Sequence, residues 1–137
     1  MNMKANELMI GDWVLVKEKP IQVEDIVPEG INTEWIAGCE YGGCIGEDEI
    51  RPIPITKELL EKNGFELDEV IKEYCIYNGI DNRVSIHNDK EYMNSVNEWH
   101  VHIDSEDYCT IAHCELTYLH ELQHLLKLCN IDFEFDV

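Results

Sequence analysis

The chain has 137 residues, of which 45% are hydrophobic, so it is long enough to bury a core as one domain or as two very small ones. It carries 29 acidic and 10 basic side chains, a net charge of −19 at pH 7. Charge of this sign repels phosphate backbones and anionic lipid, so it argues against direct binding to nucleic acid or membranes and favours a basic partner.

The acidic side chains are spread along the chain rather than confined to a tail. Residues 1–54 contain 4 basic and 11 acidic side chains, and residues 55–137 contain 6 and 18. A surface of this kind also serves solubility alone.

Six cysteines occur in a sequence whose first residues include no apolar secretory segment. No apolar run approaches the length that a membrane span needs. We therefore expect a cytoplasmic protein whose cysteines are free thiols, most of them packed as small hydrophobes. The six are Cys39, Cys44, Cys75, Cys109, Cys114 and Cys129.

Short strands separated by glycine and proline fill the first 54 residues. We predict strands at 9–17, 21–26, 31–36 and 48–51, with turns at 18–20 and 28–30. The glycine-rich stretch 38–46 predicts a loop around Cys39 and Cys44. This pattern is typical of a small, strongly bent β-barrel, and Pro52 and Pro54 end it because each lacks a strand-pairing N–H.

Helices and strands are mixed in residues 55–137. Thr56 is the predicted N-cap of a helix over 57–63, which Gly64 ends with Phe65 folding back onto it. We predict that Val70 faces the same side as Tyr74 in the first of several strands. The predicted strands are 70–77, 83–87, 99–104, 109–113 and 131–137, with a hairpin turn at Asn78-Gly79 and a loop over 89–97.

An amphipathic helix is predicted over 118–129, capped by Thr117 and ended by Asn130, because its apolar residues recur on one stripe. Leu119, Leu122 and Leu126 lie at the centre of that stripe. The fold class that follows is α+β: a small β-barrel over 1–54, then a domain over 55–137 in which an antiparallel sheet is packed by this C-terminal helix.

The motif His-Glu-x-x-His occurs on that helix as His120, Glu121 and His124. In a zinc hydrolase the two imidazoles share the metal and the glutamate is the general base. Here the helical projection places both histidines opposite the apolar stripe, facing solvent. In the longer version of this motif a glycine and a third zinc-binding histidine follow. Lys127 and Asn130 stand at those two positions here. We therefore predict a structural helix with no catalytic or metal-ligating residue, and a zinc hydrolase is the alternative.

Two thiols with four residues between them, Cys39 and Cys44, resemble half of a zinc knuckle. Cys109, His113 and Cys114 would have to supply the other half. The simpler interpretation is that these thiols pack at the ends of short strands.

Two other patterns have a binding and a structural interpretation. His100 and His102 lie on one face of a predicted strand, either as a metal clip or as the wet side of a sheet. Trp13, Trp35 and Tyr41 form either an exposed aromatic groove or part of the barrel core. The sequence has no nucleophile elbow and no phosphate-binding glycine loop.

Three stretches of this sequence, 9–14, 50–65 and 118–123, resemble a family of small uncharacterised proteins of gut-bacterial genomes, prophages and mobile elements. The resemblance implies an SH3-like barrel, a linking helix and an α+β C-terminal half, and no established activity. Members of that family often carry Gln at the position of Glu121 and Asn at the position of His124, while the pattern His120-x-Leu122-Gln123 is kept. Such variation suits a structural helix better than a zinc protease.

These observations together predict a non-enzymatic protein, without a resident cofactor or metal, that binds another protein. A basic protein is the class of partner that the charge favours. One alternative is an acidic decoy that imitates DNA and occupies a host nucleic-acid-binding protein. The other is the zinc hydrolase through His120, Glu121 and His124.

Overall fold

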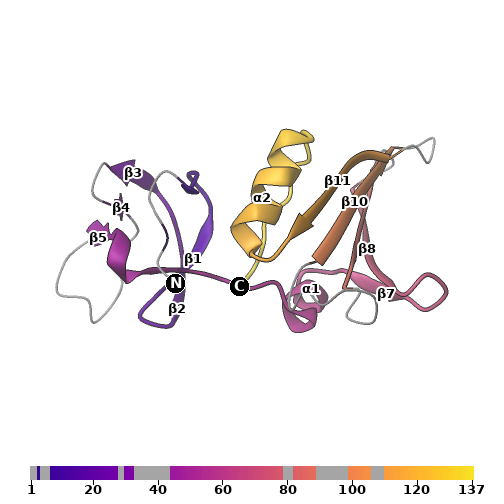
Figure 1. The fold of residues 1–137 in the computed structure, drawn as a ribbon, viewed down its shortest axis with the longest axis horizontal. Helices are drawn as coiled ribbons and strands as arrows, with labels where there is room; N and C mark the ends of the chain where they lie inside the picture. The colour runs from indigo at the N-terminus through magenta and orange to yellow at the C-terminus, as the bar shows by residue number, and fades with distance from the viewer. Residues whose placement is uncertain are drawn as a thin grey trace. The chain divides into compact units, whose positions relative to one another are not determined.

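The computed structural model of this protein describes residues 3, 7–27, 30–32, 44–78, 82–88, 99–105 and 110–137. The chain divides into two compact units (Figure 1). The first unit comprises Met1–Pro54 and Tyr118–His124, and the second comprises Ile55–Thr117 and Leu125–Val137. The chain leaves the first unit after residue 54, the position of the predicted domain boundary. The first half of the last helix, however, belongs to the first unit.

The first unit contains two three-stranded antiparallel sheets in its described part, with strand orders β2-β1-β6 and β3-β4-β5. The core beside β1 is formed by Met3, Leu8, Val14, Val16, Val23 and Ile50. The strands are β1 (Trp13–Val16), β2 (Lys19–Gln22), β3 (Asp25–Val27), β4 (Gly30–Asn32), β5 (Cys44–Gly46) and β6 (Ile50–Pro52). No ladder joins the two sheets among the residues described, so a closed barrel is not seen there and the SH3-like arrangement stays a prediction.

The first hairpin turns earlier than predicted. Its turn is Lys17 and Glu18, both with positive φ, and Val16 pairs with Lys19. Pro20 therefore lies inside β2 instead of in a turn, which is tolerated because β2 is an edge strand and needs no donor on its outer side. The strand predicted at 48–51 is also shifted, since η2, a 3₁₀ turn over Glu47–Glu49, precedes β6. The predicted turn at Pro28-Glu29 and the loop with Cys39 lie outside the described residues.

Helix α1 (Lys57–Lys62) has the predicted N-cap, because the Thr56 side chain accepts a hydrogen bond from the Leu59 N–H at 3.1 Å. It ends in a Schellman motif in which Gly64 (φ 86°) donates to the Glu61 carbonyl and Phe65 donates to the Leu60 carbonyl. Phe65 is buried, as predicted.

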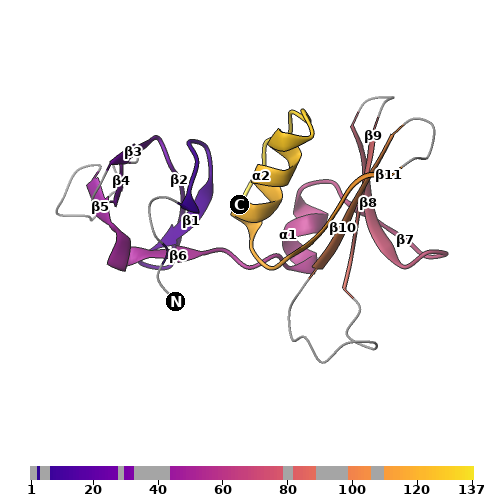
Figure 2. The same cartoon turned by 45° about the horizontal axis from the view of Figure 1, so that its top comes forward.

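A five-stranded antiparallel sheet of order β11-β10-β9-β8-β7 forms the centre of the second unit (Figure 2). The strands are β7 (Glu66–Asp68), β8 (Glu73–Asn78), β9 (Asn82–His87), β10 (Trp99–Ser105) and β11 (Thr110–Leu116). The predicted strands at 83–87, 99–104 and 109–113 are confirmed within a few residues. The strand predicted at 70–77 begins only at Glu73, and Val70, predicted to share a strand face with the buried Tyr74, is 90% exposed in the turn before it.

One face of this sheet is apolar. Residues directly opposite each other in a ladder share a face. The apolar rows are Tyr74, Ile86, Val101 and Cys114, and Ile76, Val84, Ile103 and Ala112. Helix α1 packs on this side, because the Tyr74 hydroxyl lies 3.4 Å from Glu61 Oε1 on the helix. The Trp99 indole N–H donates to the buried Ile55 carbonyl at 3.0 Å, which fixes the start of β10.

Residues 131–137 show the predicted alternation without a strand. Ile131 and Phe135 are buried, but no ladder pairs this segment among the residues described. The Asn63 side chain accepts from the Asp136 N–H at 2.7 Å and donates to the Asp136 carbonyl at 2.9 Å. One side-chain amide thus binds the backbone of the segment that was predicted to be a strand. With helix α2 (Leu119–Leu128), the architecture is α+β. None of the helices in the described part is long and apolar enough to cross a membrane.

Candidate functional site

Helix α2, which carries the His-Glu-x-x-His motif, begins at Leu119, one residue after the predicted start. The Glu121 carboxylate accepts a hydrogen bond from the Tyr118 N–H at 3.0 Å. This is the reverse bond of a capping box, in which an acidic side chain at the third helical position satisfies the N–H of the capping residue. The motif's glutamate therefore stabilises the helix start.

Gln123, a residue inside the motif, is buried and joins α2 to the start of β1. Its side-chain oxygen accepts from the Trp13 N–H at 2.9 Å, and its side-chain NH₂ donates to the Gly11 carbonyl at 3.0 Å. One amide thereby satisfies two backbone groups of the segment that enters the sheet.

His124 binds the same segment through Asp12, a carboxylate with no exposed surface. Its Nε2 lies 2.6 Å from Asp12 Oδ2, which also accepts from the Met9 N–H at 2.7 Å. Two ligands of one tetrahedral zinc ion, each about 2.0–2.1 Å from the metal, stand roughly 3.3 Å apart. The separation of 2.6 Å is that of a direct, charge-assisted hydrogen bond.

His120 is also inside the fold, with only 8% of its surface exposed. Its ring stacks on Tyr118 at 6.0 Å and meets the ring of His124 edge-on at 5.6 Å. Burial lowers the pKa of His120 below its ordinary value, opposed by the nearby Asp12 carboxylate. Its Nδ1 is buried and has no hydrogen-bond partner among the residues that the structure describes.

The prediction that both histidines face solvent is therefore wrong. The projection assigned one apolar face to the helix and treated the rest as wet. In the structure the opposite face is covered by the polar segment around Asp12, so it is buried by hydrogen bonding and leaves no apolar pattern in the sequence.

A second site lies in the second unit, on the sheet face opposite the apolar rows. Four histidines from three neighbouring strands gather there, and we call them the histidine cluster: His87, His100, His102 and His113. His100 is opposite His87 in one ladder, and His102 is opposite His113 in the other. The rings stack with centroids 4.3 Å apart for His102 and His113 and 5.0 Å apart for His87 and His100.

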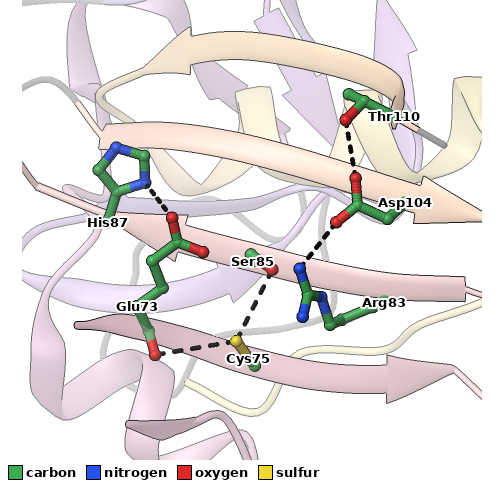
Figure 3. A network of polar contacts seen from close by, with 7 residues as sticks. All are labelled: Glu73, Cys75, Arg83, Ser85, His87, Asp104 and Thr110. Atoms are coloured by element: carbon green, nitrogen blue, oxygen red, sulfur yellow. Dashed lines mark hydrogen bonds and ion pairs between the residues drawn. The ribbon is translucent and has the colours of Figure 1, made fainter. Parts of the chain in front are cut away.

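Acidic side chains border the histidine cluster. Glu73 Oε1 lies 3.2 Å from His87 Nδ1 (Figure 3), and Glu115 Oε1 lies 3.7 Å from His100 Nδ1. Burial lowers the pKa of His102, and the neighbouring His113 lowers it further, against the opposing effect of Glu73. His102 is therefore neutral at pH 7.

The same face of the sheet also carries a polar network beside the histidine cluster (Figure 3). Asp104 accepts from Arg83 at 3.0 Å and from the Thr110 hydroxyl at 2.9 Å. Beside it the Cys75 thiol lies 3.7 Å from the Ser85 hydroxyl, and burial raises the pKa of Cys75. A protonated thiol at this position is a poor nucleophile.

The zinc knuckle drawn from Cys109, His113 and Cys114 is not supported. His113 lies in the histidine cluster, whereas Cys114 is opposite Val101 on the apolar face, because neighbouring residues of a strand point to opposite sides. Cys75, Cys114 and Cys129 are free thiols. Cys39, Cys109, Trp35 and Tyr41 lie outside the described residues, and Trp13 is half-buried in β1.

Sequence reasoning found the pair His100 and His102 but missed their joining with His87 and His113. The signal lay in the strand register, since the pairing of β10 with β9 and β11 decides which residues stand opposite the pair. Within the described ranges, no three His, Cys, Asp or Glu side chains converge on one point as metal ligands do.

No family model, curated protein or solved structure matches this chain.

Proposed function

We propose that this chain is a non-enzymatic binding protein and that its partner is a basic protein. The observation that carries the proposal is the turn between β7 and β8, which projects from the edge of the sheet (Figures 1 and 2). Val70 at this turn is 90% exposed, and Leu67 and Ile71 beside it are 42% and 43% exposed. Apolar side chains grouped at the surface are typical of contact sites.

The turn has a defined shape. Asp68 Oδ1 accepts from the Val70 N–H at 2.9 Å and from the Ile71 N–H at 3.3 Å, and the Lys72 N–H donates to the Asp68 carbonyl at 2.7 Å. A side chain that bonds the backbone two and three residues on fixes a turn. A surface already in its bound shape loses less entropy on binding, so these contacts support a recognition role.

Carboxylates surround the apolar tip. Glu66, Asp68 and Glu69 are exposed within the same hairpin, while its one basic residue, Lys72, is paired with Glu69 at 3.2 Å. Acids on an edge strand also prevent edge-to-edge aggregation. That role alone does not explain three exposed aliphatic side chains at the same edge, whereas an apolar contact with an acidic rim fits a basic protein surface.

The zinc hydrolase is the weaker candidate. Glu121 bonds the start of its own helix and His124 bonds Asp12, so both groups already have structural roles. The DNA-mimic decoy shares the acidic charge with our proposal but gives no role to exposed apolar side chains. An origin in a mobile element and an SH3-like first unit, both implied by the resemblance, are part of the same proposal.

Photo-crosslinking tests the proposed surface. A photo-crosslinking amino acid replaces Val70 in the full chain, and a matched protein carries it at Leu128, which is 85% exposed on α2. We expect position 70, and not position 128, to capture a protein with an isoelectric point above about 9. Val70→Ser should weaken the complex, measured by titration calorimetry, and Leu128→Ser should not.

Three outcomes would contradict this proposal. The first is that nothing is captured from position 70. The second is equal capture from both positions. The third is the capture of a DNA-binding protein that is displaced by duplex DNA and still binds normally to the Val70→Ser variant. That result would favour the decoy.

A further inference from the structure

The histidine cluster has no part in the proposed binding surface. We propose that it is a binding site for one borderline divalent metal ion of the zinc class, with His87, His100 and His102 as ligands and His113 beside the fourth position. Imidazole is a preferred ligand of such ions.

The sheet register supplies the backbone arrangement of a three-histidine site. His100 and His102 are two residues apart on β10, so their side chains leave the same face. His87 is opposite His100 on the neighbouring strand β9. Three imidazoles on two hydrogen-bonded strands are held by a backbone that does not need to move when an ion arrives.

Ring separations agree with a shared ion. With Zn–N bonds of about 2.0–2.1 Å and tetrahedral angles, the ring centroids of two ligating imidazoles stand roughly 5 Å apart. In the cluster the centroids of His87 and His100 are 5.0 Å apart, and those of His87 and His102 are 5.5 Å apart. The rings now lie nearly parallel, with interplanar angles of 13° and 11°, and do not converge on one point, so binding requires rotation about side-chain torsions.

Carboxylates beside Nδ1 favour this use of the rings. Glu73 lies against His87 Nδ1 at 3.2 Å and Glu115 lies near His100 Nδ1 at 3.7 Å. Neither contact has the geometry of a hydrogen bond as the rings stand, but a ring rotation that lets the carboxylate accept from Nδ1–H would fix the tautomer whose Nε2 carries the lone pair, and metal-bound histidines usually have such a partner.

Cobalt titration of the full chain tests the site. The protein is stripped with a chelator, kept reduced, and titrated with Co²⁺ alone while its visible absorption is recorded, and Zn²⁺ then competes. We expect the protein to bind one equivalent of Co²⁺ and to show visible absorption bands typical of cobalt with nitrogen ligands. His102→Gln should abolish saturable binding, and Glu73→Gln should weaken it by about 10–100-fold as a positioning residue. His124→Gln, which alters the other histidine motif, is the matched control and should bind normally.

Ring nitrogen NMR of the unsubstituted protein keeps the test independent of variant folding. We expect Zn²⁺ to shift the Nε2 signals of His87, His100 and His102. The proposal is overturned by the absence of saturable binding, by thiolate-to-cobalt charge-transfer bands, or by shifts confined to His120 and His124. It is also overturned if circular dichroism shows His102→Gln to be folded and this variant still binds one equivalent.

Discussion

Asp12 has no exposed surface, and its Oδ2 accepts from both the Met9 N–H and His124. We expect Asp12→Ala to lower the free energy of unfolding by about 2–4 kcal/mol, because a backbone donor and a half-buried imidazole lose their shared partner. Urea unfolding measures the change. Glu24→Ala, which removes an exposed carboxylate of the same unit, should change stability by less than about 0.5 kcal/mol. Equal effects of the two substitutions would contradict a role for the Asp12 contacts.

Two imidazoles make stability depend on pH. Burial lowers the pKa of His120 and of His102 in the folded protein, whereas in the unfolded chain both titrate near 6.5. As the pH falls below about 6.5 the unfolded state binds protons first, so stability is complete above that pH and is lost as the pH falls through the folded values. We expect a lower free energy of unfolding at pH 5.5 than at pH 7.5.

The His120→Gln variant isolates one of these contributions. Its difference in unfolding free energy between pH 7.5 and pH 5.5 should be smaller than that of the unsubstituted protein, because one shifted group is gone. The carboxylates act alike in both proteins and cancel in the comparison. An unchanged difference would mean that His120 is protonated as easily in the folded chain as in the unfolded one.

The glutamate of the His-Glu-x-x-His motif caps the start of helix α2. Glu121→Ala removes the acceptor of the Tyr118 N–H and should cost about 0.5–1 kcal/mol in urea unfolding. Glu121→Gln keeps an acceptor oxygen at the same position and should be nearly neutral. If the alanine variant is as stable as the glutamine variant, the capping bond contributes nothing.

The first hairpin contains backbone strain that substitution can remove. Lys17 and Glu18 occupy its turn with φ of 50° and 62°, a conformation that favours Asn and Gly. The double substitution Lys17→Asn and Glu18→Gly should raise stability by about 1 kcal/mol, even though Glu18 loses an exposed ion pair with Arg51. Glu24→Gly, outside the turn, should not stabilise. A destabilised double variant would show that the turn is unstrained.

The net charge of −19 acts on the whole molecule. Repulsion among carboxylates opposes the compact state, and added salt screens it over a distance of about 10 Å at 0.1 M. We expect Tm to rise by about 4 °C between low salt and 0.5 M NaCl, equivalent to roughly 1 kcal/mol. Calorimetric scans at equal viscosity with a neutral osmolyte provide the control. A Tm that falls with NaCl would mean that attractive ion pairs outweigh the repulsion.

Elements whose causes are local could be predicted from the sequence. The cap at Thr56, the stop at Gly64 and the fold-back of Phe65 depend on residues within one helix and its ends. The alternation in β10 was likewise readable, because one side of that strand is apolar and the other polar. Val70 was misplaced because the turn before β8 is set by Asp68, whose side chain bonds the backbone without leaving a periodic pattern.

The sequence by itself determined the α+β class, the capped helix α1 and the amphipathic stripe of α2, since each follows from contacts between residues close along the chain. Only the tertiary structure decided what the histidines do. His124 is 112 residues from Asp12, and His87, His100 and His113 come from separate strands, so their meeting depends on long-range pairing and strand register. Polar side chains that are buried against polar partners resemble a solvent-exposed face in sequence, and only their partners distinguish the two.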